Sequence, residues 1–231
     1  LTRSSAASDV YKRQIYLDNI NKTFGSVQAN KDVCLSVMPG TIHGIVGENG
    51  AGKSTLVSIL YGFYSADSGT VAISGELVRL RSSADAIAAG IGMVHQHFML
   101  VPNFTVLENI ILGHEGGSDL KAGARQAEAS LKGITERYGL SVDLQAAVQD
   151  LPVGLQQRVE ILKALYRGAR ILILDEPTGV LTPQETEQLF DILRTLKAQG
   201  VTILLITHKL KEIMAVTDFV SVMRSGEMVD H

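Results

Sequence analysis

The stretch GENGAGKST, residues 47–55, constrains the fold of this chain more than any other feature. It matches the phosphate-binding pattern G-x-x-x-x-G-K-[ST], whose fixed positions are taken by Gly47, Gly52, Lys53 and Ser54. The apolar run Thr41–Val46 before it predicts a short buried strand. This strand–loop–helix order is the context that the motif requires, so a chance glycine-rich turn is disfavoured.

Physical chemistry gives each part of this loop a task. Glycines allow a tight turn whose N–H groups point inward at phosphate oxygens, and the following helix N-terminus adds partial positive charge. We expect Lys53 to reach the β- and γ-phosphates and the Ser54 hydroxyl to take a Mg²⁺ position. The residues expected to hold the nucleotide here are Gly47, Asn49, Gly50, Gly52, Lys53, Ser54 and Thr55. The sequence therefore predicts a protein that binds a nucleoside triphosphate.

Composition narrows the class of protein. Of 231 residues, 45% are hydrophobic and 19% charged, which suits one large domain or two closely packed subdomains. The formal net charge of −3 disfavours a general nucleic-acid binder, so no nucleic-acid partner is expected. A single cysteine, Cys34, excludes an internal disulfide and indicates a reducing compartment. No run approaches the roughly 18 apolar residues of a membrane helix, so any membrane role is expected to come through partners.

The first fourteen residues, LTRSSAASDVYKRQ, differ from the rest of the chain. They lack apolar periodicity and the apolar core of a signal peptide. They resemble translated adapter sequence, and a disordered native tail is the alternative. We therefore predict that residues 1–14 are a non-native or disordered tail and that the fold occupies residues 15–231.

Strand and helix patterns alternate through the first part of that fold. Residues 15–38 predict two or three short strands with a turn at Phe24-Gly25. Leu56, Ile59, Leu60 and Phe63 predict the buried face of the helix after the loop. The run Gly69–Gly75 predicts a strand antiparallel to the first segment, and Ser83–Ala89 and Ile91–Val94 predict a short helix and a strand.

The middle of the chain, from about residue 98 to 151, carries helical signals only. Thr105 and Glu108 form a capping box that opens a short helix, and a second helical pattern stops at Gly139. Another helix is predicted from Leu155. We read this region as a helical insertion.

The last third returns to alternating strands and helices. Ile171–Glu176 and Val201–Thr207 are apolar strands. Between them a capping box of Thr182 and Glu185, with Pro183 at the first helical position, opens a helix that Gly200 ends. A hairpin is predicted around Ser225-Gly226. Alternating strands and helices predict an α/β protein with a mainly parallel core sheet.

ILILDE, residues 171–176, places Asp175 and Glu176 at the carboxyl end of a buried strand, the sheet edge where such folds bind ligands. Four apolar residues followed by two acids resemble a Walker B motif. Asp175 is then expected to hold Mg²⁺ and Glu176 to polarise the attacking water.

Five further features, together with these two motifs, resemble the ATP-binding subunit of ABC transporters over nearly the whole chain, from Ile15 to His231. Gln96 in GMVHQHF resembles the Q-loop glutamine, which contacts Mg²⁺ and the water and links to the transmembrane partner. LPVGLQQRVEILKAL, residues 151–165, takes the place of the signature sequence, and GVLT, residues 179–182, that of the D-loop.

Two ring-bearing side chains complete the resemblance. His208 in ITHKL resembles the switch histidine that contacts the γ-phosphate, and Phe24 in KTFGSV resembles the aromatic residue that stacks on adenine, which favours ATP over GTP. Alone, each would be read as an ordinary surface or core residue, and the order and spacing of all seven features carry the match. The resemblance implies catalytic roles for Glu176, His208 and Gln96 and a Mg²⁺ set of Ser54, Gln96 and Asp175.

The family resemblance also implies the architecture. The implied fold is an α/β P-loop NTPase, with a RecA-like, mainly parallel core and an antiparallel β subdomain in residues 15–96 and 156–231. A helical subdomain that carries the signature is expected in residues 97–155.

The signature departs from the family pattern L-S-G-G-Q, because it reads LPVGL, residues 151–155. The family's serine and glycine groups contact the γ-phosphate of ATP held by an opposite ATPase domain. Pro152 offers neither a hydroxyl nor an N–H, whereas Gly154 remains for that contact. Thr182 stands where the D-loop usually has aspartate. An ATP site shared between two ATPase domains is called a composite site here. The composite site to which this signature contributes is therefore expected to hydrolyse ATP slowly or to be mainly structural.

These departures indicate a subgroup of the family. Three stretches, residues 94–113, 151–169 and 174–185, are similar to the N-terminal half of tandem ATPases from bacterial simple-sugar and nucleoside importers, with the nucleoside type favoured. That similarity implies a second ATPase domain after His231, transmembrane permease subunits, a substrate-binding lipoprotein as indirect partner, and a place at the cytoplasmic face of the membrane. The isolated chain is expected to bind nucleotide but to turn it over poorly.

Two alternatives remain open on sequence grounds. One is a non-transport ABC ATPase acting in DNA repair or on ribosomes, although the chain lacks the long coiled-coil or basic insertion usual there. The other is a degenerate, non-hydrolysing dimerisation module, which only Pro152 favours. The transported solute does not follow from any contact, because the ATPase never touches it.

Overall fold

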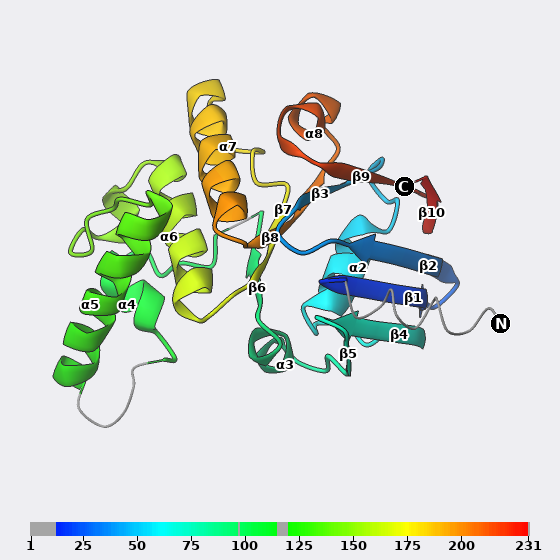
Figure 1. Ribbon diagram of the computed structural model, residues 1–231, viewed down its shortest axis with the longest axis horizontal. Coiled ribbons are helices and arrows are strands. Elements are labelled where there is room, and N and C mark those ends of the chain that lie inside the picture. Colours follow the sequence, from blue (N-terminus) through cyan, green and yellow to red (C-terminus); the bar gives the residue numbers. More distant parts are fainter. Residues whose placement is uncertain (1–12, 97, 115–119, 231) are drawn as a thin grey trace.

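Two β-sheets and a group of helices make up the molecule (Figure 1). The structure, a computed structural model, describes residues 13–96, 98–114 and 120–230. Positions 1–12 of the predicted tail lie outside the described residues, whereas Gln14 already donates its N–H to the Val37 carbonyl at 2.8 Å. The boundary of the tail at residue 14 stays a prediction.

The larger sheet has six strands in the order β10-β9-β3-β8-β7-β6. Five of them run parallel, and β10 pairs with β9 in the antiparallel direction. Their bounds are Ile42–Val46 for β3, Ile91–Val94 for β6, Ile171–Asp175 for β7, Thr202–Thr207 for β8, Phe219–Arg224 for β9 and Glu227–Asp230 for β10. The mainly parallel core predicted from the sequence is confirmed.

The register of this sheet aligns the ends of its central strands. Val46 pairs with Thr207, and Asp175 pairs with Ile206. The residues that follow β3, β7 and β8 therefore emerge together at one edge, as expected for ligand sites in such sheets.

The smaller sheet is antiparallel, with the order β2-β1-β4-β5. Its strands are Ile15–Phe24 for β1, Val27–Val37 for β2, Ser68–Ile73 for β4 and Glu76–Val78 for β5. Residues 15–38 thus form two long strands joined at Gly25-Ser26. The predicted antiparallel pairing of the segment after the loop helix with the first strand is confirmed.

The helices lie around the larger sheet and at one end of the molecule, where α4 and α5 lie far from the smaller sheet (Figure 1). In its described part, the insertion predicted between residues 98 and 151 holds helices joined by loops and no strand, apart from an isolated β-bridge between Thr105 and Ala147. The helices are Lys53–Leu60 (α2), Ser83–Ala88 (α3), Val106–Ile111 (α4), Leu120–Tyr138 (α5), Val153–Tyr166 (α6), Pro183–Ala198 (α7) and Leu210–Val216 (α8), with a 3₁₀ turn at Val148–Asp150 (η1).

Capping boxes predicted from the sequence open two of these helices. The Thr105 hydroxyl accepts the Glu108 N–H before α4, and the Thr182 hydroxyl accepts the Glu185 N–H before α7. In each box the glutamate carboxylate also accepts the N–H of the threonine. Pro183 occupies the first turn of α7, as predicted.

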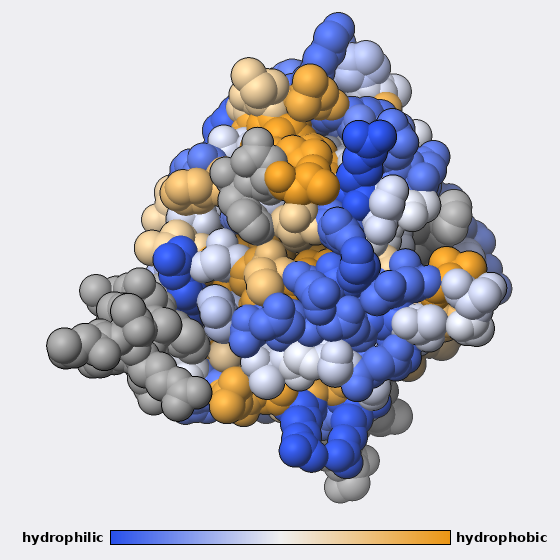
Figure 2. All heavy atoms as spheres, turned by 90° about the vertical axis from the view of Figure 1, so that its right-hand side faces the viewer, coloured by the Kyte–Doolittle hydropathy of each residue, from blue (hydrophilic) through white to orange (hydrophobic). Residues whose placement is uncertain are grey.

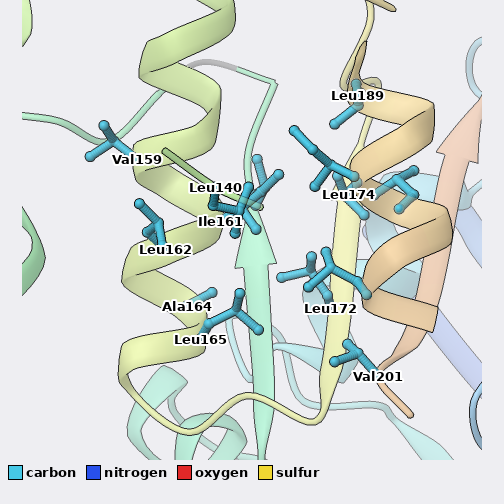
Figure 3. Close-up of a cluster of buried hydrophobic side chains, with 14 of the residues drawn as sticks. Leu140, Val159, Ile161, Leu162, Ala164, Leu165, Leu172, Leu174, Leu189 and Val201 are labelled. Atoms are coloured by element: carbon cyan, nitrogen blue, oxygen red, sulfur yellow. The ribbon is translucent and has the colours of Figure 1, made fainter. Parts of the chain in front are cut away.

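Both faces of the larger sheet are buried, which explains why its strands read as continuous apolar runs. Along β7, Leu172 and Leu174 join a core shared with α6, α7 and the helical insertion, drawn in part in Figure 3. Ile171 and Ile173 face the other way, into a core shared with α2 and the antiparallel sheet. β7 therefore contributes side chains to both hydrophobic cores, one on each face of the larger sheet.

Three local features differ from the prediction. Phe63 does not belong to the buried helix face, because α2 ends at Leu60 and Gly62, at φ 78°, reverses the chain; the Phe63 side chain is 50% exposed. The short strand β5 and the short helix α8 were not predicted. β5 has three residues and α8 has two turns, and both are too short to give a clear periodic pattern.

Within the described ranges, no helix is long and apolar enough to cross a bilayer. The face shown in Figure 2 is hydrophilic over much of its middle and carries apolar residues near the top. Of the exposed apolar side chains, Met214 and Leu210 on α8 are among the most accessible.

Candidate functional site

The glycine-rich loop joins the end of β3 to the start of α2, as predicted. Two of its glycines have no substitute: a Cβ at Gly47 would lie 2.2 Å from the Met223 carbonyl oxygen, and one at Gly52 would lie 2.2 Å from that of Ala29. Gly52 also has φ 99°, in the left-handed region. The motif glycines are therefore required by backbone packing as well as by access to a ligand.

α2 begins with its N-terminus available to an anion. Its N-cap, Gly52, has no side chain to cap the helix, and no acidic residue lies in the first turn. A helix N-terminus of this kind favours phosphate through its N–H groups and its dipole. The Asn30 side chain, which the sequence did not single out, donates to the Gly52 carbonyl at 3.1 Å and braces the loop from β2.

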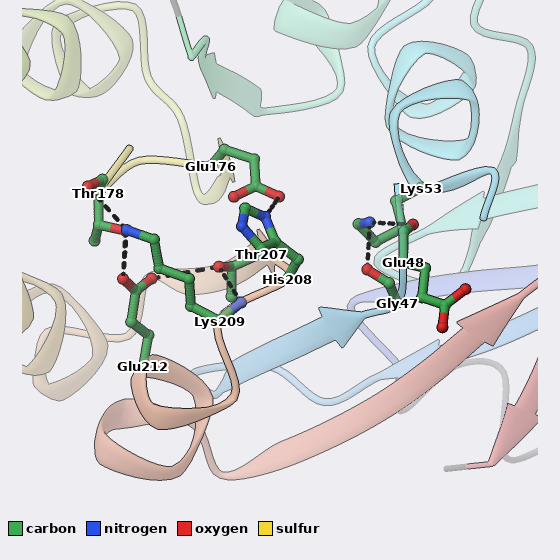
Figure 4. Close-up of polar contacts among 9 residues, drawn as sticks. All are labelled: Gly47, Glu48, Lys53, Glu176, Thr178, Thr207, His208, Lys209 and Glu212. Atoms are coloured by element: carbon green, nitrogen blue, oxygen red, sulfur yellow. Dashed lines mark hydrogen bonds and ion pairs between the residues drawn. The ribbon is translucent and has the colours of Figure 1, made fainter. Parts of the chain in front are cut away.

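Lys53 is folded back over the loop. Its Nζ donates to the carbonyl oxygens of Gly47 at 2.7 Å and Glu48 at 2.9 Å, and the residue is only 6% exposed (Figure 4). The ammonium group is thus held at the mouth of the loop by two neutral acceptors. A phosphate oxygen is a stronger, charged acceptor for the same group.

A cavity of about 680 Å³ gathers most of the predicted site residues. The loop forms one wall, and Gln96, Asp175, Glu176 and His208 come to it from the ends of β6, β7 and β8. The remaining lining residues are Val27, Gln28 and Ala29 of β2 with Ser225 and Gly226 of the β9–β10 hairpin. The cavity is therefore built at the aligned carboxyl edge of the parallel sheet.

The two carboxylates at the end of β7 have different surroundings. Burial raises the pKa of Asp175, the negative charge of Glu176 raises it further, and Lys53 lowers it. A cation beside Asp175 would offset the first two effects. Glu176 has φ 48°, a left-handed conformation that costs energy for a residue with a Cβ and that is enriched at functional sites.

Glu176 and His208 meet across the ends of β7 and β8. His208 Nδ1 lies 2.9 Å from Glu176 Oε1, and the proton on this contact depends on the tautomer of the ring (Figure 4). The Glu176 side chain is 14% exposed and that of His208 is 50% exposed. The two catalytic candidates that the sequence placed 32 positions apart are thus hydrogen-bonded.

A polar network beside this pair was missed at the sequence level. Lys209 Nζ donates to the carbonyl and hydroxyl oxygens of Thr178, at 3.2 and 3.1 Å, and pairs with Glu212 at 3.1 Å (Figure 4). Glu212 is buried and also accepts the hydroxyl protons of Thr178 and Thr207. The network ties the loop after β7 to the loop that carries His208. The sequence signal was weak: a lysine directly after His208 and a glutamate three positions after that lysine.

The Mg²⁺ ligands implied by the resemblance all line this cavity: Ser54, Gln96 and Asp175. In the described part of the chain, no group of three or more His, Cys, Asp or Glu side chains could hold a metal. One carboxylate, a hydroxyl and an amide fit Mg²⁺, which is commonly bound by few protein oxygens together with substrate phosphates. The residues present therefore fit a magnesium–nucleotide complex better than a free metal ion.

Phe24 lies beside the cavity, and it is not among the residues that line it. Its ring is 42% exposed, lies 5.1 Å from the Tyr64 ring at 70°, and has the Lys22 ammonium 5.4 Å from its centroid. Its strand partner, Val27, does line the cavity. Stacking of adenine on Phe24 stays a prediction.

Gly154 is at a different place from the loop cavity. It lies in the first turn of α6, and its N–H donates to Glu185 Oε1 at 3.0 Å. The contact predicted for this residue, with ATP of another domain, is not tested by a single chain.

A family model described as ABC transporter matches residues 30–179. The chain is 50% identical over 241 residues to the glucose import ATP-binding protein TsgD13 of Haloferax volcanii, covering 92% of this chain and 44% of that protein. It is also 50% identical over 216 residues to the nucleoside import ATP-binding protein NupA of Lactococcus lactis, covering 94% and 43%. The chain thus spans less than half the length of these curated relatives.

Solved structures with the same fold are cassettes of the same kind. A cassette of an ABC transporter in its ADP conformation superposes with a TM-score of 0.84 at 29% identity, covering 94% of this chain and 89% of that one. A dimeric bacterial ABC transporter cassette superposes with a TM-score of 0.76 at 28% identity, covering 93% and 96%.

Proposed function

The chain belongs to the ABC transporter family, and on that premise we propose that it binds ATP with Mg²⁺ and hydrolyses it to energise uptake of a small solute. The observation that carries the proposal is the shared cavity of Lys53, Asp175, Glu176 and His208. A triphosphate site needs a cation, a metal ligand and a group that orients water, and this edge of the sheet supplies all three.

In the proposed complex the loop N–H groups and the α2 N-terminus hold the phosphates. Lys53 exchanges its two carbonyl acceptors for phosphate oxygens, and Ser54, Gln96 and Asp175 hold Mg²⁺, which neutralises phosphate charge. Asn49, Gly50 and Thr55 add backbone and side-chain contacts along the loop. Phe24, exposed beside the cavity, offers a ring face to adenine.

For hydrolysis, Glu176 orients the attacking water and His208 contacts the γ-phosphate. Their 2.9 Å contact and their shared place in the lining of the loop cavity support this assignment. Burial and the negative charge of Glu176 raise the pKa of Asp175, and a bound cation would stabilise the two neighbouring carboxylates in their ionised form.

The proposed partners are a second ATPase domain and transmembrane permease subunits. The relatives are more than twice as long as the aligned chain, and one neighbouring cassette is a dimer; both support a pair of ATPase domains. We propose that the second domain belongs to the same protein and that its signature covers the γ-phosphate at this loop.

A groove beside Gln96 supports contact with a permease. It has a volume of about 240 Å³ and lies between β6, the end of α2 and α6. Its lining combines aromatic rings with charge: Phe63 stacks on His95, the Tyr61 ring meets His95 edge to face, and Glu160 and Lys163 also line the groove. Because His95 precedes Gln96, movement of a permease segment here would reach the nucleotide site directly.

The proposed solute is a nucleoside or a simple sugar, and the proposed location is the cytoplasmic face of the membrane beside the permease. The support is the naming of both relatives as import ATP-binding proteins, one for glucose and one for nucleosides. A substrate-binding lipoprotein would deliver the solute from the other side.

The test is ATP turnover by the purified chain and its Glu176→Gln variant, with ATP binding measured in parallel. We expect turnover to fall by at least about a hundredfold while ATP affinity is retained, because only the orientation of water is lost. Glu187→Gln, at an exposed position of α7, is the matched control. Unchanged turnover in Glu176→Gln would contradict the assignment of Glu176 as the residue that orients the attacking water.

A further inference from the structure

The N-terminus of α6 is occupied by a carboxylate from another helix. The Gly154 N–H donates to Oε1 of Glu185, 31 positions away at the start of α7. α6 supplies no cap of its own: its N-cap is Pro152, which makes no side-chain hydrogen bond, and its first turn holds no acidic residue. Glu185 therefore provides the anion that this helix end attracts.

The second oxygen of Glu185 fixes the carboxylate in place. Oε2 accepts the Thr182 N–H at 2.9 Å and the Thr182 hydroxyl at 2.8 Å, within the capping box of α7. The contacts with Thr182, followed by that with the Gly154 N–H, hold the pKa of Glu185 below its ordinary value. One charged carboxylate thus caps two helices.

The packing leaves no room for a second anion at the same N–H. A Cβ on Gly154 would lie 2.8 Å from Glu185 Oε1 and 3.0 Å from its Cγ, so the carboxylate lies directly against this glycine. A phosphate oxygen could accept the Gly154 N–H only after displacing Glu185, and two unpaired anions in contact repel each other.

We propose that Glu185 closes the α6 end of this chain to the γ-phosphate of a triphosphate bound by an opposing ATPase domain. The inference rests on the proposed function, because it presupposes such a pair of domains. It assigns the weakness of one composite site to a specific charged side chain, in addition to the missing hydroxyl at Pro152. Removing the charge then opens the site.

The experiment is sedimentation equilibrium of the purified chain with saturating ATP and Mg²⁺, comparing the wild type with Glu185→Gln and Glu187→Gln. Glutamine keeps the size and one capping oxygen but loses the charge. We expect the ATP-dependent dimer of Glu185→Gln to be tighter by about tenfold or more. Glu187→Gln should match the wild type, and ADP should produce no difference. Equal constants for wild type and Glu185→Gln, including no dimer in either, overturn the inference.

ATP binding measured in the same samples separates the two claims. If the wild type binds ATP and Glu185→Gln changes nothing, only this inference fails; if the wild type does not bind ATP, both fail. A second readout needs no substitution: hydrogen–deuterium exchange of the peptide 152–157 in the wild type. We expect its exchange to be unaffected by ATP, and new ATP-dependent protection there would overturn the inference even if Glu185→Gln does not fold.

Discussion

The two helix N-termini that carry motif glycines differ in what lies against them. α2 begins at Gly52 with no cap and no acidic residue in its first turn, and Lys53 lies beside it. α6 begins at Pro152, also without a cap of its own, but Glu185 already accepts the Gly154 N–H. The N-terminus of α2, the open end, therefore offers an anion site. At the N-terminus of α6, the closed end, a carboxylate of the chain itself already takes that place.

The comparison shows that a glycine at a helix start does not by itself make a phosphate site. Both ends have the dipole and the N–H groups that favour an anion. The neighbouring side chain decides: an ammonium group adds attraction at α2, and a carboxylate adds repulsion at α6. The predictions below change one member of this comparison at a time.

The largest effect is expected from Lys53→Ala, which removes the cation from the open end. We expect ATP affinity to fall by about a hundredfold, equivalent to about 2.7 kcal/mol, because a charge-assisted hydrogen bond to phosphate is lost. Calorimetric titration with ATP and Mg²⁺ measures it, and Lys211→Ala on the exposed side of α8 is the control. Unchanged affinity would show that the open end does not hold the triphosphate.

A smaller effect is expected from Glu212→Gln, which weakens the network that holds the His208 loop to the loop after β7. Turnover should fall by about tenfold at unchanged ATP affinity, because His208 loses its position and not its chemistry. Lys209→Met should act alike, and the double variant should be no worse than either single one. Additive losses would indicate two separate roles.

Asp175→Asn should separate stability from metal binding. Because burial and Glu176 raise the folded-state pKa of Asp175 above its unfolded value, ionised Asp175 lowers stability, and this cost appears as pH rises through the raised pKa. Asparagine removes the cost. At neutral pH the variant without nucleotide should therefore melt at a higher temperature than the wild type, and the difference should shrink in acid.

The same Asp175→Asn variant should lose the Mg²⁺ dependence of ATP binding, because the remaining candidate ligands Ser54 and Gln96 are neutral. Thermal unfolding across pH and ATP titration with and without Mg²⁺ measure the two effects. A variant with lower stability at neutral pH, or with Mg²⁺ dependence retained, would contradict the role given to Asp175.

The smallest effect is expected from Thr182→Ala at the closed end. Loss of the α7 cap should lower the free energy of unfolding by about 1 kcal/mol. The backbone N–H of residue 182 still donates to Glu185 and holds its carboxylate against Gly154, so ATP-dependent association should stay at the wild-type level. Urea unfolding gives the first quantity and sedimentation the second; tighter association in Thr182→Ala would show that the cap, rather than the carboxylate, closes the α6 end.

Much of the fold followed from the sequence because its signals are local. The apolar run 171–174, the capping boxes at Thr105 and Thr182, and the Ser225-Gly226 turn each specify structure within a few residues. Phe63 was placed wrongly because a helical spacing does not show where Gly62 ends the helix. β5 and α8 are too short for periodicity to reveal them.

The gathering of most candidate residues in one cavity was predictable from the sequence, and their contacts were less so. Motif order placed Asp175, Glu176 and His208 at strand ends and Lys53 after the loop that follows β3, and parallel register then brings those strand ends together. The braces were not visible: Asn30 reaches the loop from β2, and Glu185 reaches Gly154 across 31 positions. Such long-range hydrogen bonds leave no periodic signature, and Glu185 was recognisable only as a capping residue.

The measurement that tests the contrast most directly is a glycine-labelled nitrogen-15 NMR titration of the wild-type chain with ATP and Mg²⁺. We expect the backbone amide signals of Gly47, Gly50 and Gly52 to shift as the site fills, while that of Gly154 stays in place. The account is contradicted if the Gly154 signal shifts with the same midpoint, or if the loop glycines do not respond.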